Sequence, residues 1–75
     1  MSKLDYSKGF YDSGELLWEG WKLDGKHHNE EGPAHVSYKR DGGVWLKWWY
    51  LNGVNYTEEE WKDLVFRKVF EEQVL

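Results

Sequence analysis

The stretch Val44-Trp45-Leu46-Lys47-Trp48-Trp49-Tyr50-Leu51 is the densest aromatic run of the chain. Tight-turn sequences bracket it, with Asp41-Gly42-Gly43 before it and Asn52-Gly53 after it. Asp-Gly and Asn-Gly are typical of two-residue β-hairpin turns, because both residues tolerate positive φ. The run is therefore predicted to be a central β-strand, and both of its faces are apolar because successive side chains alternate between them.

The same pattern occurs earlier in the chain, at an offset of 28 residues and without a gap. The aligned pairs include Gly14 and Gly42, Leu17 and Trp45, Trp21 and Trp49, Leu23 and Leu51, and Gly25 and Gly53. We therefore predict two copies of a strand–turn–strand–turn unit, in which a helix follows the second copy. Trp48 aligns with Gly20, so its indole belongs to the second copy alone. Trp48 is for this reason the first residue of the strand to test for function.

The remaining segments complete a single domain of 75 residues. Residues 1–8 are predicted to be a loose N-terminal segment, residues 9–56 the two-repeat sheet, and residues 57–75 a helix packed on the sheet, on a partner or on both. Thr57 and Glu60 have the spacing of a helix capping box. The predicted fold class is α+β and mainly β, with an antiparallel β meander of about five or six short strands followed by one C-terminal α-helix.

Composition excludes several classes of protein. A net charge of −4 argues against a nucleic-acid binder, which carries a basic face. No apolar run reaches the roughly 20 residues of a membrane span, and the first residues lack the apolar core of a signal peptide, so a cytoplasmic location is expected. The chain has no cysteine, and its six Trp, five Tyr and three Phe residues are expected to supply most of the core.

The stretch from Gly25 to Ala34, GKHHNEEGPA, resembles the "GK-x-H-R-x-D-GPA" segment of the MORN-like repeats of small phage and bacterial proteins. Tyr38, the Asp41-Gly42 turn and the run from Trp49 to Gly53 resemble the "Y…DG…WY-x-NG" remainder of that repeat. The resemblance implies an antiparallel β meander and no catalytic residues. It also implies a structural role in the repeat for five residues, namely Trp21, Gly25, His28, Trp49 and Gly53.

The only cluster with the chemistry of metal ligands contains three histidines and two glutamates: His27, His28, His35, Glu30 and Glu31. His27 and His28 are adjacent, so in a strand they point to opposite faces. His28 and His35 could approach each other across the Gly32-Pro33 loop. We favour a structural role for His28 in hydrogen bonding the loop, and we predict no metal and no cofactor. No nucleophile–base set and no phosphate-binding loop is present, so an enzyme is not expected.

The aromatic residues divide into two rows. Leu17, Trp21, Leu23, Trp45, Trp49 and Leu51 are repeat-matched and predicted to form the core. Glu19 and Lys47 lie in the same row and either pair across strands or mark where this face opens to water. The opposite row carries Trp18, Val44, Leu46, Trp48 and Tyr50. One helix covers only one face of a sheet, so the second row is either covered by the N-terminal segment or presented to a partner.

The predicted helix raises the same question. Trp61, Leu64, Val65 and Val69 form one apolar stripe, and Phe66, Phe70 and Val74 form a second stripe on nearly the opposite side. Packing on one sheet needs only one stripe. The second stripe is therefore predicted to meet a partner, for which a symmetric homodimer is the commonest arrangement, or to fold over the sheet edge.

The sequence predicts a small non-enzymatic protein-binding module, phage-encoded and acting on a host protein such as a defence-system component. Its predicted partner-binding residues are Trp18, Trp48, Tyr50, Phe66 and Phe70. Two alternatives stay open: a self-assembling structural protein with no external target, and a carbohydrate or small-ligand binder that uses exposed Trp side chains as stacking platforms.

Overall fold

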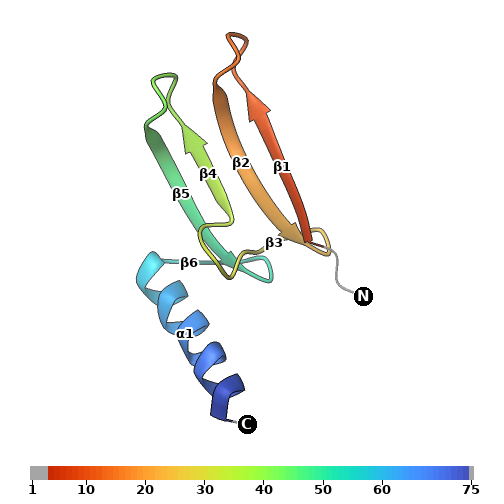
Figure 1. Ribbon diagram of the computed structural model, residues 1–75, viewed down its shortest axis with the longest axis vertical. Coiled ribbons are helices and arrows are strands. Elements are labelled where there is room, and N and C mark those ends of the chain that lie inside the picture. The colour runs from red at the N-terminus through yellow and green to blue at the C-terminus, as the bar shows by residue number, and fades with distance from the viewer. Residues whose placement is uncertain (1–3, 75) are drawn as a thin grey trace.

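An antiparallel sheet and one helix make up the fold (Figure 1). The structure is a computed structural model that describes the backbone of residues 4–74 and the side chains of residues 4–68. Its elements are β1 (Leu4–Phe10), β2 (Leu16–Leu23), β3 (Lys26–His27), β4 (His35–Tyr38), β5 (Val44–Leu51), β6 (Val54–Tyr56) and α1 (Glu58–Val74). The strand order is β1-β2-β4-β5-β6, and β3 pairs with β2. The predicted class, a β meander followed by a C-terminal helix, is confirmed.

The backbone repeats with the offset seen in the sequence. Strands β2 and β5 begin and end 28 residues apart. The turns before them are closed by equivalent hydrogen bonds, from Tyr11 N to Glu15 O and from Lys39 N to Gly43 O. The turns after them place Asp24 and Asn52 at φ 52° and 51°, and each is followed by a glycine at φ 83°. Positive φ at both central residues is what a type I′ hairpin turn requires, so the two-residue turn is confirmed at Asn52-Gly53. At Asp41-Gly42 only the glycine has positive φ, and the turn is longer, because Lys39 N donates to Gly43 O.

Each copy also has a β-bulge at the equivalent place. The register between β1 and β2 shifts after Gly9, and the register between β4 and β5 shifts after Ser37. The extra residues are Leu17 in β2 and Trp45 in β5, since neither has a partner in the ladder. Bulges of this kind increase the local twist and redirect neighbouring side chains.

The two copies are joined along β2 of the first copy and β4 of the second. Trp21 N donates to Ala34 O, and Ala34 N donates to Trp48 O. The loop from His28 to Pro33 lies outside the strands. Asn52 N donates to His28 Nδ1 of this loop at 2.9 Å. The His28 side chain is buried. This contact between the loop of one copy and the turn of the other is the kind that a structural role for His28 predicts.

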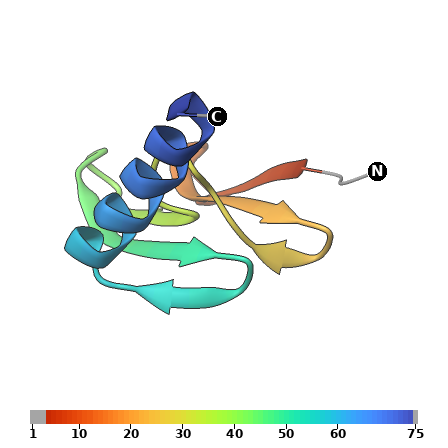
Figure 2. The ribbon, with the colours of Figure 1, turned by 90° about the horizontal axis from the view of Figure 1, so that it is seen from below.

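Trp61 anchors the helix to the sheet. Its ring lies 4.7 Å from the ring of Trp49, and its Nε1 donates to Asn29 O at 2.8 Å. The helix begins with the predicted capping box, since Thr57 N donates to Glu60 Oε1 and Glu60 N donates to Thr57 Oγ1. Figure 2 shows α1 to one side of the strands. We call this side, which carries Trp21, Val36, Lys47 and Trp49, the helix face.

The core is small. Among the described residues the buried apolar side chains are Ala34, Val36 and Trp61, and no large side chain is fully buried. The predicted core row is therefore partly wrong. Trp45 is 64% exposed, because the helix lies beside β6 and the Leu51 end of β5, far from the start of β5 (Figure 1), and because Trp45 is a bulge residue. Leu17, the equivalent bulge residue, is half-buried and lines a hollow beside Trp18 on the opposite face.

Two further expectations differ from the structure. Residues 4–8 are not loose, because they form most of β1, where β2 supplies the backbone partners and the Tyr6 ring lies 5.0 Å from that of Trp21. Val44 was placed on the face of Trp48, but it lines a groove on the helix face, because the bulge brings it opposite Tyr38.

Candidate functional site

The face opposite the helix carries most of the predicted partner-binding residues. In the ladder Gly20 is opposite His35 and His35 is opposite Trp48, while Trp18 and Leu46 both face Ser37. Residues paired in this way share one face of a sheet. We call this surface the aromatic face and define it by six residues: Trp18, His27, His35, Leu46, Trp48 and Tyr50. The structure thus brings Trp18, Trp48 and Tyr50 together, as predicted from the alternation of side chains.

Ring contacts connect the members of the aromatic face. The Trp18 ring stacks on the His35 ring at 5.8 Å and 18°. The His27 ring lies 5.0 Å from that of Tyr50 and 6.3 Å from that of His35. Trp48 remains 42% exposed, and Leu46 is exposed beside it. The result is an aromatic surface in which the rings of Trp18, His35, His27 and Tyr50 are connected, and the exposed Trp48 indole lies on the same face opposite His35.

Two glycines seat the Trp18 indole. A Cβ atom at Gly9 would lie 2.2 Å from Trp18 Nε1, so this position accepts no side chain while the indole is in place. A Cβ atom at Gly20 would lie 3.4 Å from Trp18 Cζ3, an ordinary van der Waals distance, so Gly20 lies against the indole but only Gly9 requires glycine. The contact of Gly9 and Gly20 with Trp18 was not predicted from the sequence. The available signal was a glycine inside a strand, which often marks a close approach by another group.

A hollow of about 380 Å³ opens beside Trp18. His27, His35 and Lys22 line it together with Ser7, Leu17, Gly20 and Ser37. Burial lowers the pKa of His35, and the nearby His27 lowers it further, so His35 is uncharged at neutral pH. Its Nε2 lies 3.2 Å from Ser37 Oγ. His27 Nδ1 is buried with no hydrogen-bond partner among the described atoms.

The histidines do not pair as the ligand hypothesis required. His28 lies at the loop and contacts Asn52 and Glu30, whereas His35 belongs to the aromatic face with His27. Within the described part of the chain, no three His, Asp or Glu side chains are close enough to hold a metal ion.

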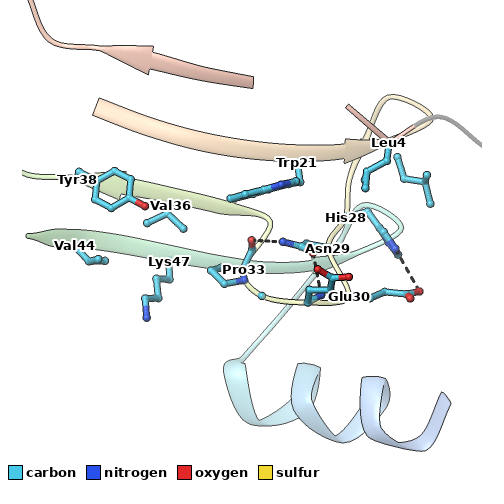
Figure 3. A pocket seen from close by; sticks show the side chains of 13 residues that line it. Leu4, Trp21, His28, Asn29, Glu30, Pro33, Val36, Tyr38, Val44 and Lys47 are labelled. Carbon is cyan, nitrogen blue, oxygen red and sulfur yellow. Dashed lines mark hydrogen bonds and ion pairs between the residues drawn. The ribbon is translucent and has the colours of Figure 1, made fainter. Parts of the chain in front are cut away.

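A second concavity lies on the helix face (Figure 3). This groove of about 690 Å³ runs between the 28–33 loop and the strands, and its apolar floor is formed by Trp21, Val36 and Val44. Asn29 shapes the loop, because its Nδ2 donates to Pro33 O and its Oδ1 accepts from Glu31 N. Glu30 is ion-paired with Lys68 and lies 3.5 Å from His28 Nε2. These contacts tie the loop to α1 and make one wall of the groove polar.

Glu19 is a charged residue of the helix face with two defined partners. The hydroxyls of Tyr6 and Tyr38 both donate to its carboxylate. The two hydroxyls hold the pKa of Glu19 below its usual value, and the carboxylate raises the pKa of Tyr38 to about 12. Glu19 therefore pairs with tyrosines, while Lys47, two strands away, lines the groove.

The helix residues predicted to bind a partner are only partly described. Phe66 is 70% exposed, and Leu64 of the first stripe is exposed as well. The side chain of Phe70 lies outside the described residues. Among the structural repeat residues, Trp21 and Trp49 are half-buried on the helix face, and Gly25 and Gly53 have positive φ.

No protein family, curated protein or solved structure matches the chain. The resemblance to MORN-like repeats stays a prediction. No helix in the described part of the chain is long and apolar enough to cross a membrane.

Proposed function

We propose that this chain is a small non-enzymatic protein-binding module that docks on another protein through the aromatic face. The observation that carries the proposal is the exposed cluster around Trp48, on the side of the sheet opposite the helix anchor. Exposed apolar patches of this kind mark interaction sites, and Trp and Tyr are the side chains most enriched where binding energy concentrates.

The side chains of the aromatic face indicate which groups a complementary partner surface would carry. Trp48 and Leu46 offer apolar surface, while Lys22 supplies a positive charge at the rim. The uncharged imidazole of His35 allows the face to be desolvated at neutral pH without burying a charge there. A complementary surface is apolar at its centre and carries carbonyl or carboxylate acceptors around it.

The biological setting rests on the MORN-like resemblance. It favours a phage-encoded protein that acts in the host cytosol on a host or bacterial protein, such as a component of a defence system. Binding would then inhibit or modulate that protein, without catalysis, cofactor or nucleic acid.

Trp48→Ala tests the proposal, with Trp45→Ala as its matched control. Both substitutions remove an exposed indole from β5, but only Trp48 belongs to the aromatic face. A host protein captured by the intact chain should bind the Trp48→Ala variant at least tenfold more weakly, which is about 1.4 kcal/mol, and the Trp45→Ala variant almost unchanged. Circular dichroism checks that both variants fold. Equal losses, or capture of nothing from any plausible host, would sink the proposal.

Phe66→Ala asks whether the exposed side of α1 belongs to the same interface. If it does, the affinity falls together with that of Trp48→Ala. If the affinity is unchanged, the interface is confined to the aromatic face.

The hollow beside Trp18 favours a second candidate, a carbohydrate or small-ligand binder. An aromatic ring next to Lys22, Ser7 and Ser37 offers both a stacking surface and polar contacts. Tryptophan fluorescence titration against a glycan panel tests this candidate, and a saturating change that disappears in Trp18→Ala supports it. A flat titration with every glycan removes it.

A further inference from the structure

Strand β1 ends the strand order of the sheet and leaves a long outer edge. It spans seven residues and pairs with β2 on its inner side. Within residues 4–74 no strand pairs with its outer side. The bulge of this hairpin lies in β2, at Leu17, so β1 itself carries no extra residue, and its register with β2 is regular from Leu4 to Gly9. A regular, uncovered edge without proline is a template for adding another strand.

The repeat shows what such an edge accepts. Strand β4 is the counterpart of β1 in the second copy, and it is paired on both sides, with β2 and with β5. The same backbone element is therefore compatible with pairing on both of its edges in this fold.

The molecule also exposes more surface than its mass predicts. Its accessible surface is 5766 Å². A compact monomer of 9.1 kDa exposes about 4,900 Å². The excess belongs to an elongated molecule of 49 × 28 × 19 Å and is spread over several elements. Leu4, Tyr6 and Phe10 of β1 contribute to it, since all three are exposed.

We propose that two copies of this chain pair antiparallel through the outer edges of β1, with the two-fold axis at Ser7. A two-fold axis normal to the sheet keeps each face continuous, so the paired residues must lie on the same face. Centring the axis on Ser7 is the register that pairs all seven residues of β1.

This register is self-complementary in chemistry. On the helix face Leu4 meets Phe10 of the second copy, and Tyr6 meets Lys8. On the aromatic face Ser7 meets Ser7, and Asp5 meets Gly9. No two like charges are directly opposite each other in this register. Within each copy Lys8 is also opposite Glu19 in the β1–β2 pair, so its positive charge is next to a carboxylate. Lys8 Nζ lies 6.0 Å from the Tyr6 ring centroid within one copy, so a lysine beside this tyrosine is an arrangement that the chain already uses.

A head-to-tail arrangement is less favourable. Shifting the β2–β4 pairing by one repeat would place β1 on the outer edge of β5 in another copy. That register pairs three residues and sets Lys47 opposite Lys8. The equivalent position in the β2–β4 pair holds Glu19 opposite Val36, which are not like charges. The like charges oppose it, and such a contact would build an open series of copies instead of a closed dimer.

A single introduced cysteine tests the register, because the chain has none of its own. In the proposed dimer the two Ser7 Cα atoms are about 4.5–5.5 Å apart, which suits a disulfide. Ser7→Cys should therefore give a covalent dimer under mild oxidation. Asp5→Cys is the matched control, since its symmetry mate is displaced by about 14 Å along the strand, and it should give little.

The solution mass tests the dimer independently. Light scattering should give twice the 9.1 kDa of the chain at high concentration. Ser7→Asp sets two carboxylates opposite each other at the axis and should raise the dimer dissociation constant on the order of tenfold. The same charge change at the exposed Asn55 of β6, Asn55→Asp, should leave the dissociation constant unchanged.

Four results would overturn the proposal: a monomer at every concentration, an open-ended series of masses, equal crosslinking of the two cysteine variants, or a dimer insensitive to Ser7→Asp. The proposal does not depend on an external partner.

Discussion

The two copies of the repeat share a backbone but differ in the side chains that they present. The turns, the bulges and the bounds of β2 and β5 recur 28 residues apart. On the aromatic face, however, Trp18 and Gly20 of the first copy become Leu46 and Trp48 of the second. The Trp18 indole of the first copy lies against Gly9 and Gly20, whereas the Trp48 indole of the second copy is exposed. Equivalent backbones therefore present different surfaces.

The segments that follow the two copies differ even more. After the first copy the chain makes the 28–33 loop, and after the second it makes α1. The two meet where Trp61 Nε1 donates to Asn29 O. Substituting equivalent positions in the two copies separates what the repeat shares from what each copy adds.

Trp61→Ala should have the largest effect. It removes a side chain that is 7% exposed, the contact with Trp49 and the hydrogen bond to Asn29. We expect a loss of about 3–5 kcal/mol in the free energy of unfolding, measured by urea denaturation. Leu64→Ala, on the same helix but exposed, should cost about 1 kcal/mol or less. Similar losses for the two variants would show that Trp61 is not the anchor.

Gly9→Ala should come next, because its Cβ atom would overlap the Trp18 indole. Displacing the indole should cost about 1–3 kcal/mol and change the tryptophan emission. Ser37→Ala is the control at the equivalent position of the second copy, where a side chain is already accepted and only the contact with His35 is lost. Its expected cost is about 1 kcal/mol or less. A silent Gly9→Ala would mean that Trp18 does not lie on Gly9.

Gly25→Ala and Gly53→Ala test the turns that the copies share. Both glycines have φ 83°, which an alanine adopts only with strain. Each substitution should cost about 1 kcal/mol in thermal or urea unfolding. A Cβ atom at Gly53 would meet the Lys26 side chain at an ordinary 3.5 Å, so the two costs should agree within about 0.5 kcal/mol. A clear inequality would show that the turns are not equivalent.

The smallest expected effect is a pH dependence that arises from Glu19 of the first copy and its tyrosine partners. The tyrosine hydroxyls lower the pKa of Glu19 in the folded state, so its stabilising contribution is present above pH 4.5 and is lost as the pH falls. The pKa of Tyr38 is raised to about 12, so its contribution is present below pH 10 and is lost as the pH rises toward 12.

Glu19→Gln should therefore reduce the loss of folding stability that occurs as the pH falls below 4.5, measured by urea denaturation at a series of pH values. Lys47→Gln, at the equivalent position of the second copy, should leave that loss unchanged. Parallel curves for the intact chain and Glu19→Gln would contradict the role of the tyrosine contacts.

The sequence predicted the meander, the capping box and the turns because those features depend on local residues. Asp24-Gly25 and Thr57 with Glu60 need no knowledge of distant partners. Strand β1 was missed because its polar sequence forms a strand only when β2 supplies hydrogen bonds and Trp21 supplies a surface for Tyr6.

The candidate site was predicted as a row of residues but not as a surface. Alternation placed Trp18 and Trp48 on one face, whereas the stacking of His35 and the seating glycines depend on which strands become neighbours. Leu17 and Trp45 were predicted to be core residues because they are apolar side chains at equivalent positions of the two copies. That both are bulge residues could not be predicted from the sequence, since a bulge depends on how two strands pair.

The bond from Asn52 N to His28 Nδ1 bears on the order in which the chain folds. It joins residues 24 positions apart, and Trp61 reaches back 32 positions to Asn29. The 28–33 loop therefore acquires its partners only after the second hairpin and the start of the helix have formed. A solenoid can add repeats one at a time, because each contacts only its neighbour. Here the first copy is completed by the second, so we expect both to form in one cooperative transition, at a rate limited by closing these long loops.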